Sequence, residues 1–216
     1  MTIRTRLASF GRDRHGLALL EFALTLPLVL TVLLFGLELC NYGISILRVH
    51  QIAATSADNA ARVRDSISEA DVNEVLLGGK IVGEPMDFAG SGRIVLSDVT
   101  PNGFSDGRRG QRIVWQRCAG ALNVPDSQPQ YGTSGKGESD ATLQAMGTPG
   151  NQIAASENTA MVFVEVTYRY KPIVSSMLFG TPIIRSEASF PVRERTSETL
   201  NPTPSATASA CSVFQS

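Results

Sequence analysis

The chain has 216 residues, of which 43% are hydrophobic and 18% are charged, and its formal net charge is −1. A chain so close to neutral offers no excess of Lys and Arg for a phosphate backbone, so no nucleic-acid partner is expected. The 176 residues that follow the apolar run described below are enough for one modest core and not for two.

Residues 1–16 form a short basic leader. Four arginines lie in it: Arg4, Arg6, Arg12 and Arg14. They are opposed by one acid, Asp13, whereas the fifteen residues after Cys40 carry one formal charge, that of Arg48. Because positive charge is retained on the cytoplasmic side, this asymmetry predicts a cytoplasmic N-terminus and an extracytoplasmic remainder.

An apolar run of 24 residues, Leu17 to Cys40, follows the leader, with acids only at Glu21 and Glu38. As a helix it would be about 36 Å long, enough to cross a hydrocarbon core of about 30 Å. Pro27 lies inside the run, which membrane helices tolerate. A buried helix of a soluble core is the alternative, but so long a run near the N-terminus favours a membrane span over residues 17–40.

The carboxylate of Glu21 needs a reason to lie in such a run, because a charge at the bilayer centre costs about 2.5–3.5 kcal/mol on insertion scales. It could simply reach back to the cytoplasmic interface. Alternatively, if the chain is cut after Gly16, Leu17 carries a new α-amine and Glu21 becomes the fifth mature residue. The carboxylate could then pair with the amine of a neighbouring subunit and set the register of an assembly.

The spacing from Gly16 to Glu21-Phe22, behind a basic leader and heading an apolar helix, resembles that of class III (type IV-like) prepilins. The fuller pattern is similar to that of the TadE-like family of tight-adherence pilus assembly proteins, or minor pseudopilins. It consists of Arg14-His15-Gly16, Glu21-Phe22-Ala23-Leu24, Pro27 and Gly36-Leu37-Glu38-Leu39. The resemblance covers about residues 12–62, roughly a quarter of the chain.

This resemblance implies that a prepilin peptidase cuts between Gly16 and Leu17, and that Glu21 and Phe22 act in assembly. Leu17 stands where classical type IV pilins commonly have phenylalanine, and Phe22 replaces the tyrosine of the small major pilins of this system. Together with the length of the chain, the second departure indicates a minor component. The implied partners are the inner membrane, the peptidase and other pilin or pseudopilin subunits.

The helix is expected to continue past the membrane as an amphipathic extension over residues 41–68. Apolar, mostly small residues recur there at steps of three and four: Ile46, Val49, Ala53, Ala57, Ala60, Val63 and Ile67. This face could pack on the protein's own domain, or part of it could pack on neighbouring helices in an assembly.

Residues 69–196 are expected to form a β-rich extracytoplasmic domain. Four runs read as strands: 93–99, 111–117, 159–170 and 183–192. They are rich in β-branched and aromatic residues and are separated by turn residues. The predicted fold class is α+β, with one N-terminal transmembrane helix continuing into an amphipathic spine that packs against a small antiparallel sheet.

Two segments are poor in apolar residues and therefore predicted to be loops. Residues 123–158 read as a long loop with a short helix near 142–146. Residues 197–216 read as a flexible tail, which a disulfide could tie down.

Of the three cysteines, Cys40 lies in or at the membrane, so Cys118 and Cys211 are the plausible pair for a bridge outside. Such a bridge would close a loop of about 94 residues and contribute roughly 4–5 kcal/mol in the chain-entropy model. Two free thiols are the alternative.

No convincing catalytic group is present. His15 lies in the leader and His50 next to the membrane, so neither is expected to join a shared site. Residues 103–107 match GxSxG, but a Pro-Asn turn precedes them and no histidine base is at hand, so a hairpin loop is predicted. Residues 132–137 lack the spacing of a phosphate-binding loop, and Trp115 reads as a core aromatic. We therefore expect no enzyme, metal site, cofactor or small-molecule substrate.

The sequence thus predicts a minor pseudopilin-like structural or assembly component of a bacterial tight-adherence pilus or secretion system. It would be a single-pass inner-membrane protein with a cytoplasmic N-terminus and a periplasmic C-terminal domain. The alternative is a membrane-tethered periplasmic binding or adhesion domain that never enters pili. Gly16 and Glu21 separate the two, because an inert tether needs neither; a membrane-bound enzyme is a distant third.

Overall fold

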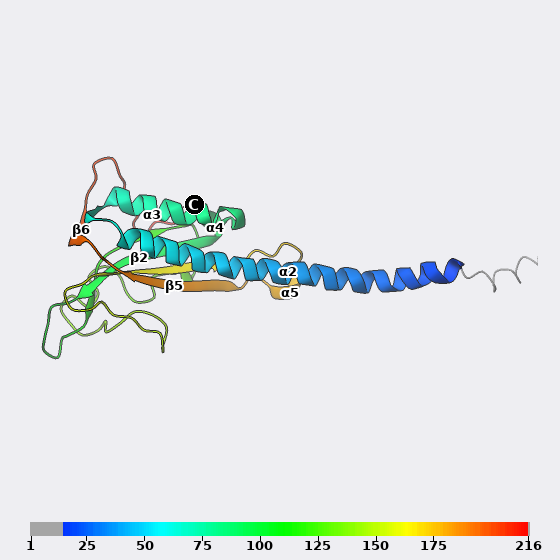
Figure 1. Cartoon of the computed structure of the whole chain (residues 1–216), viewed down its shortest axis with the longest axis horizontal. Helices are drawn as coiled ribbons and strands as arrows, with labels where there is room; N and C mark the ends of the chain where they lie inside the picture. Colours follow the sequence, from blue (N-terminus) through cyan, green and yellow to red (C-terminus); the bar gives the residue numbers. More distant parts are fainter. Residues whose placement is uncertain (1–14, 216) are drawn as a thin grey trace, which may run out of the picture. The chain divides into compact units, whose positions relative to one another are not determined.

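The computed structural model describes residues 15–215, so the predicted leader, apart from its last two residues, lies outside the described part. The chain forms two compact units, of which one comprises the chain up to Tyr42 together with Pro172–Gly180. We call this the anchor unit. The other, called the head, comprises Gly43–Lys171 and Thr181–Ser216. Helices and strands combine into the predicted α+β fold (Figure 1).

The elements follow one another along the chain as α2 (His15–Ala61), β1 (Asp65–Ser68), α3 (Glu69–Val82), η1 (Glu84–Met86), α4 (Phe88–Ser91), β2 (Gly92–Pro101), β3 (Gln111–Ala119), η2 (Pro125–Ser127), β4 (Met161–Arg169), α5 (Ser176–Phe179), β5 (Ile183–Pro191) and β6 (Arg195–Asn201).

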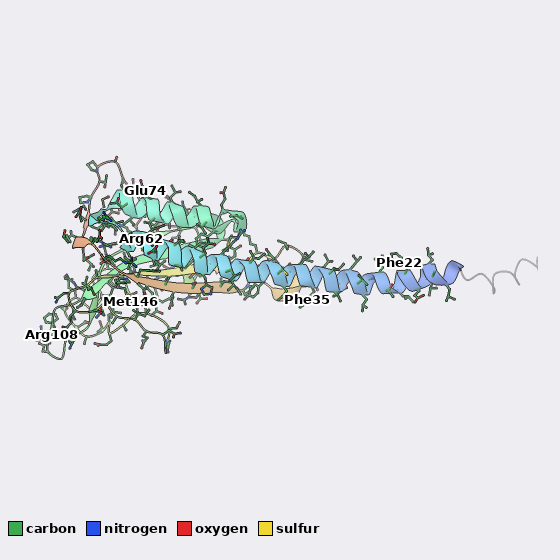
Figure 2. All side chains as sticks on the ribbon, viewed as in Figure 1. Phe22, Phe35, Arg62, Glu74, Arg108 and Met146 are labelled. Carbon is green, nitrogen blue, oxygen red and sulfur yellow. A yellow bond between two sulfur atoms is a disulfide. The ribbon has the colours of Figure 1, made fainter. Side chains whose placement is uncertain are left out.

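Helix α2 supplies the anchor. Among the described residues, one helix, Gly16–Ala61, is long and apolar enough to cross a membrane, and its most apolar window is wholly unburied. The side chains of Phe22 and Phe35, both on this half of α2, are exposed (Figure 2). Pro27 lies inside the helix, and Thr31 Oγ1 donates to Pro27 O at 2.7 Å. The prediction of one N-terminal helix that is long and apolar enough to cross a membrane is confirmed.

The later half of α2 is the spine of the head. Five of its side chains are fully buried: Val49, Ile52, Ala53, Ala57 and Ala60. Helix α3 packs closely on it through Gly79, where an added Cβ would lie 2.9 Å from Ser56 Oγ and 2.5 Å from Ile94 Cδ1 of β2. The small residues thus let α2, α3 and the sheet share one core.

A four-stranded antiparallel sheet in the order β3-β2-β4-β5 forms the centre of the head. All four predicted strands are present within two residues of their expected ends. Strand β4 is buried from Met161 to Tyr168, so both of its faces are covered. One face of the sheet, which carries Ile94 of β2, packs on the helices. The opposite face packs against the loop 123–158. The buried residues there form a loop-covered core of Val99, Ile113, Leu143, Met146, Met161 and Phe163.

The predicted helical extension to residue 68 is wrong in its last part. Helix α2 ends at Ala61, and Asp65 takes a positive φ of 57°, which is incompatible with a continuing helix. Residues 65–68 instead form β1, which pairs in parallel with β6. The following residues form α3, which the prediction of a β-rich domain from residue 69 did not include. Its start is set by a capping box of Ser68 and Asp71.

The predicted short helix at 142–146 is also absent from the loop 123–158. Met146 and Ile153 instead exchange two backbone hydrogen bonds of 2.9 and 2.7 Å as an isolated antiparallel bridge. Apart from η2 and this bridge, the loop is irregular, as predicted. It follows the sheet closely because Leu143 and Met146 are buried in the loop-covered core.

The tail 197–216 is held more firmly than its composition predicts. Cys118 and Cys211 form a disulfide with a Cα–Cα distance of 4.7 Å. The fully buried Arg93 donates from Nη1 to Val213 O at 3.1 Å and from Nη2 to Cys211 O, and its guanidinium stacks on the Phe214 ring. A flexible tail was expected because Ser, Thr, Pro and Ala bury little surface; here a buried cation binds the tail carbonyls instead.

Cys118→Ser should release the tail from β3 and lower the free energy of unfolding, by up to about 4–5 kcal/mol in the chain-entropy model. Limited proteolysis of the full chain in detergent should cut the tail faster than in the parent protein. Cys40→Ser is the matched control, since Cys40 is a free cysteine. Equal tail protection in all three proteins would contradict a bridge that orders the tail.

Candidate functional site

The predicted processing and assembly residues all lie in the first two turns of α2. Leu17 is 71% exposed and Phe22 61% exposed, and a Cβ at Gly16 would meet no atom within 4 Å. The bond after Gly16 is therefore in the first helical turn, where fraying costs least. Nothing in the described chain covers this bond, so a membrane peptidase could reach it.

Glu21 lies one turn beyond Leu17, about 6 Å along the helix axis and on the same face. It is exposed, and within residues 15–215 no side chain forms an ion pair with it. Glu38, at the other end of the span, differs, because its buried carboxylate accepts a hydrogen bond from Val174 N at 2.7 Å. Within residues 15–215, Glu21 thus has no partner that corresponds to Val174 N at Glu38.

A cavity of about 760 Å³ lies at the β5 edge of the sheet in the head. His50 of α2 and Ser186 of β5 meet there, with 2.7 Å between Nδ1 and Oγ. Tyr131 OH donates to Glu187 Oε1 at 2.7 Å. His50, placed next to the membrane by its position in the sequence, thus lines a cavity of the head, because the spine passes directly beside β5.

This His–Ser pair lacks the rest of a catalytic triad. A serine nucleophile needs its histidine oriented by an acid on the other ring nitrogen, and among the described residues no carboxylate bonds to His50. Ser186 is also only 5% exposed. The pair therefore serves to fasten β5 to α2.

Glu165 of β4 is a buried carboxylate beside the cavity. Burial raises its pKa to about 7, although Gln130 N donates to Oε1 at 3.0 Å and Arg185 lies 3.8 Å away. Its other oxygen has no hydrogen-bond partner among the described residues. Burial, together with the nearby Glu187 carboxylate, also raises the pKa of Tyr131.

A second buried cluster fastens β6 to the rest of the head. Arg195 Nη1 lies 2.7 Å from Asp98 Oδ2 and 3.0 Å from Glu198 Oε2, and Nη2 donates to Ala60 O at 3.2 Å. Burial raises the pKa of Asp98 to about 8, against the opposing effect of the Arg195 charge. One guanidinium thus joins β2, β6 and the end of α2, which is a structural role.

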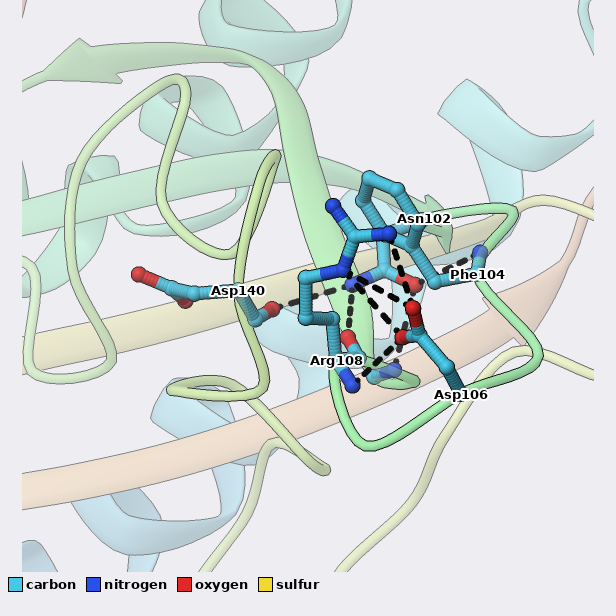
Figure 3. A network of polar contacts seen from close by, with 6 residues as sticks. Asn102, Phe104, Asp106, Arg108 and Asp140 are labelled. Atoms are coloured by element: carbon cyan, nitrogen blue, oxygen red, sulfur yellow. Dashed lines mark hydrogen bonds and ion pairs between the residues drawn. The ribbon is translucent and has the colours of Figure 1, made fainter.

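The GxSxG match lies in the β2–β3 hairpin loop, as predicted. Asn102 organises the loop, donating from Nδ2 to the carbonyls of Arg108, Gly137 and Asp140 at 2.7–3.1 Å (Figure 3). The Arg108 guanidinium stacks 4.0 Å from the Phe104 ring centre and pairs with Asp106 (Figure 3). These contacts shape a turn and leave no base beside Ser105 in the described chain.

The glycine-rich stretch 132–137 pairs with the outer side of β3. Gly135 N donates to Ile113 O at 2.8 Å, and Ile113 N donates to Lys136 O at 3.0 Å. Gly137 has a φ of 79° and lies so close to Gln111 O that a Cβ would collide with it. The glycines therefore permit close packing on a strand, which accounts for them without a phosphate ligand.

Within residues 15–215 no group of three His, Cys, Asp or Glu side chains is placed to hold a metal ion. No family model matches the chain, and no significant match was found among curated proteins or solved structures. The resemblance to the TadE-like family therefore stays a prediction.

Sequence reasoning did not find the cavity or the two buried charge clusters. The one visible signal was Glu165 itself, an acid in the middle of the strong strand run MVFVEVTY. A charge inside such a run indicates a buried, partnered group, because an isolated buried charge is too costly.

Glu165→Gln should remove a pH-dependent loss of stability from the head. In the parent, the folded-state pKa of about 7 exceeds an unfolded value of about 4.3. The Glu165 contribution is therefore fully present below about pH 4.3 and is lost as the pH rises through 7, by at most about 1.4 kcal/mol per pH unit. Glutamine keeps an oxygen for Gln130 N but does not titrate.

Thermal unfolding of the full chain in detergent, from about pH 5 to pH 8, should show a smaller fall in midpoint for Glu165→Gln than for the parent. The exposed Glu84→Gln serves as the control and should follow the parent. Parallel curves for all three proteins would contradict a raised Glu165 pKa.

Proposed function

We propose that the chain is a minor pseudopilin-like component of a bacterial tight-adherence pilus or secretion system. The carrying observation is Glu21, which forms no ion pair within residues 15–215 and lies one turn after the candidate cleavage site, in an apolar helix that continues as the spine of a folded head. A tether alone needs no acid there, and an acid in a bilayer calls for a partner. A neighbouring subunit's α-amine meets that requirement.

In this proposal the protein crosses the inner membrane once, with its N-terminus in the cytoplasm and its head in the periplasm. A prepilin peptidase at the cytoplasmic face removes residues 1–16. Other pilin or pseudopilin subunits then pack their helices beside α2, and the exposed Phe22 contributes to that contact. The oxidising periplasm suits the Cys118–Cys211 bridge.

Gly16→Leu should block processing, because a bulky side chain before the scissile bond obstructs an active site that accepts glycine. Membrane fractions of cells that express the peptidase should then hold the full-length precursor. N-terminal sequencing of the parent should start at Leu17. Ala18→Leu makes a similar change of bulk on the other side of the bond and should still mature. A normally matured Gly16→Leu protein would exclude cleavage at this site.

Glu21→Ala should act after insertion. Removing an acid from the span preserves or eases membrane entry, but the partner amine in an assembly loses its counter-charge at a cost of about 3–5 kcal/mol. The variant should therefore fractionate with the inner membrane yet fail to co-purify with other subunits. Thr25→Ala, one turn further along the same exposed helix, should assemble like the parent. Normal assembly of Glu21→Ala would remove the basis of the proposal.

A membrane-tethered periplasmic binding or adhesion domain is the second candidate function. The cavity at the β5 edge favours it, since about 760 Å³ lined by His50, Tyr131 and Arg185 is large enough for a small ligand. This function needs neither cleavage nor Glu21. The Gly16 and Glu21 variants therefore distinguish the two candidates.

A further inference from the structure

The connection between β4 and β5 is unusually apolar for an extracytoplasmic loop. Residues 172–184 read PIVSSMLFGTPII and contain no charged residue. Ile173 is 66% exposed and Met177 is 93% exposed. Large apolar side chains usually lie inside a fold, so two such exposed side chains in one short uncharged segment indicate a surface that contacts something apolar.

This segment packs on the membrane helix. Pro172–Gly180 belongs to the anchor unit, and its Val174 N donates to Glu38 Oε2 at 2.7 Å. Figure 1 shows α5 of this segment beside α2. Glu38 is 21 residues beyond Leu17, or about 32 Å along the helix, which is the thickness of a hydrocarbon core. The segment therefore contacts α2 where the helix leaves the bilayer.

We propose that Pro172–Gly180 rests in the outer leaflet as a second membrane contact, with Ile173 and Met177 facing lipid. Lipid is the favoured occupant because the segment is continuous with the exposed apolar surface of α2, which itself needs lipid. Burying apolar side chains at the boundary of head groups and acyl chains strengthens membrane attachment.

The backbone of the segment fits this position. A backbone N–H group without a hydrogen-bond partner is costly near the hydrocarbon region. Three N–H groups of this segment have partners. Val174 N donates to Glu38, Met177 N donates to Ser175 Oγ at 3.1 Å, and Gly180 N donates to Ser176 O at 2.8 Å. Glu38 gains as well, since its carboxylate at the edge of the span accepts the hydrogen bond of Val174 N.

Charges bracket the segment and limit its depth. Lys171, which precedes it, pairs with Asp87 of the head, and Arg185 follows the uncharged run. The contact thus comprises one short turn at the interface and not a second span. The proposal rests on membrane insertion of α2 and does not depend on incorporation into a pilus.

The test places a tryptophan at the exposed position in the full chain. Met177→Trp is reconstituted into phosphatidylcholine vesicles with either ordinary or brominated acyl chains, which quench nearby indoles. Val32→Trp, 65% exposed on α2, reports insertion of the span. Ile153→Trp, 46% exposed in the head, is the control for a water-facing site. The parent supplies the background of Trp115, which is 4% exposed.

Bromolipid should reduce the emission of Met177→Trp almost as much as that of Val32→Trp and far more than that of Ile153→Trp. Quenching of Val32→Trp alone would overturn the proposal while leaving the span and the proposed function intact. A shielded but unquenched indole in Met177→Trp, whose emission changes with the protein-to-lipid ratio, would also overturn it, in favour of a second copy of the chain. Absence of quenching at position 32 would overturn both the lipid contact and the membrane span.

Discussion

Helix α2 has to satisfy two different environments with one continuous backbone. Up to Leu39 its large apolar side chains stand exposed, whereas from Val49 to Ala61 its inward face is buried among protein atoms. A helix meets the demand for backbone hydrogen bonds in both settings, which no strand or loop could do alone. The change of side chains, from large and apolar to small and closely packed, is what divides the molecule into anchor and head. The sheet and α3 are arranged around the second half.

Two buried arginines, Arg93 and Arg195, bind the C-terminal part of the chain to the rest of the head through polar contacts. Arg93 binds three backbone carbonyls, those of Gly120, Cys211 and Val213, and burial lowers its pKa. Arg195 instead pairs with carboxylates. A guanidinium suits both tasks because its planar fork presents several donors at once. The last part of the chain, poor in apolar residues, is thereby ordered by polar contacts.

Sequence patterns reveal those elements that are determined by residues close together in the chain. Strand runs such as 159–170 carry their own alternation and β-branched residues, and the apolar span needs only its length. Helix α3 was missed because Gly78 and Gly79 interrupt its pattern and resemble a turn, while Gly79 serves for close packing. Strand β1 has four residues and a partner about 130 positions away. The candidate processing site is equally local, whereas the His50–Ser186 contact joins residues 136 apart, so no spacing rule could find it.

The parallel pair of β1 and β6 has a mechanical consequence. Strand β1 starts at Asp65, close to the end of α2, and β6 ends at Asn201, where the tail begins. In a parallel ladder these two points lie at opposite ends, so tension between anchor and tail is shared by its hydrogen bonds in shear and does not open them one at a time. Beyond Cys211 the disulfide carries the load covalently into β3, an outer strand of the four-stranded sheet. A pull on the residues after Cys211 is thus transmitted to β3, whereas a pull applied between Asn201 and Cys211 loads the β1–β6 ladder.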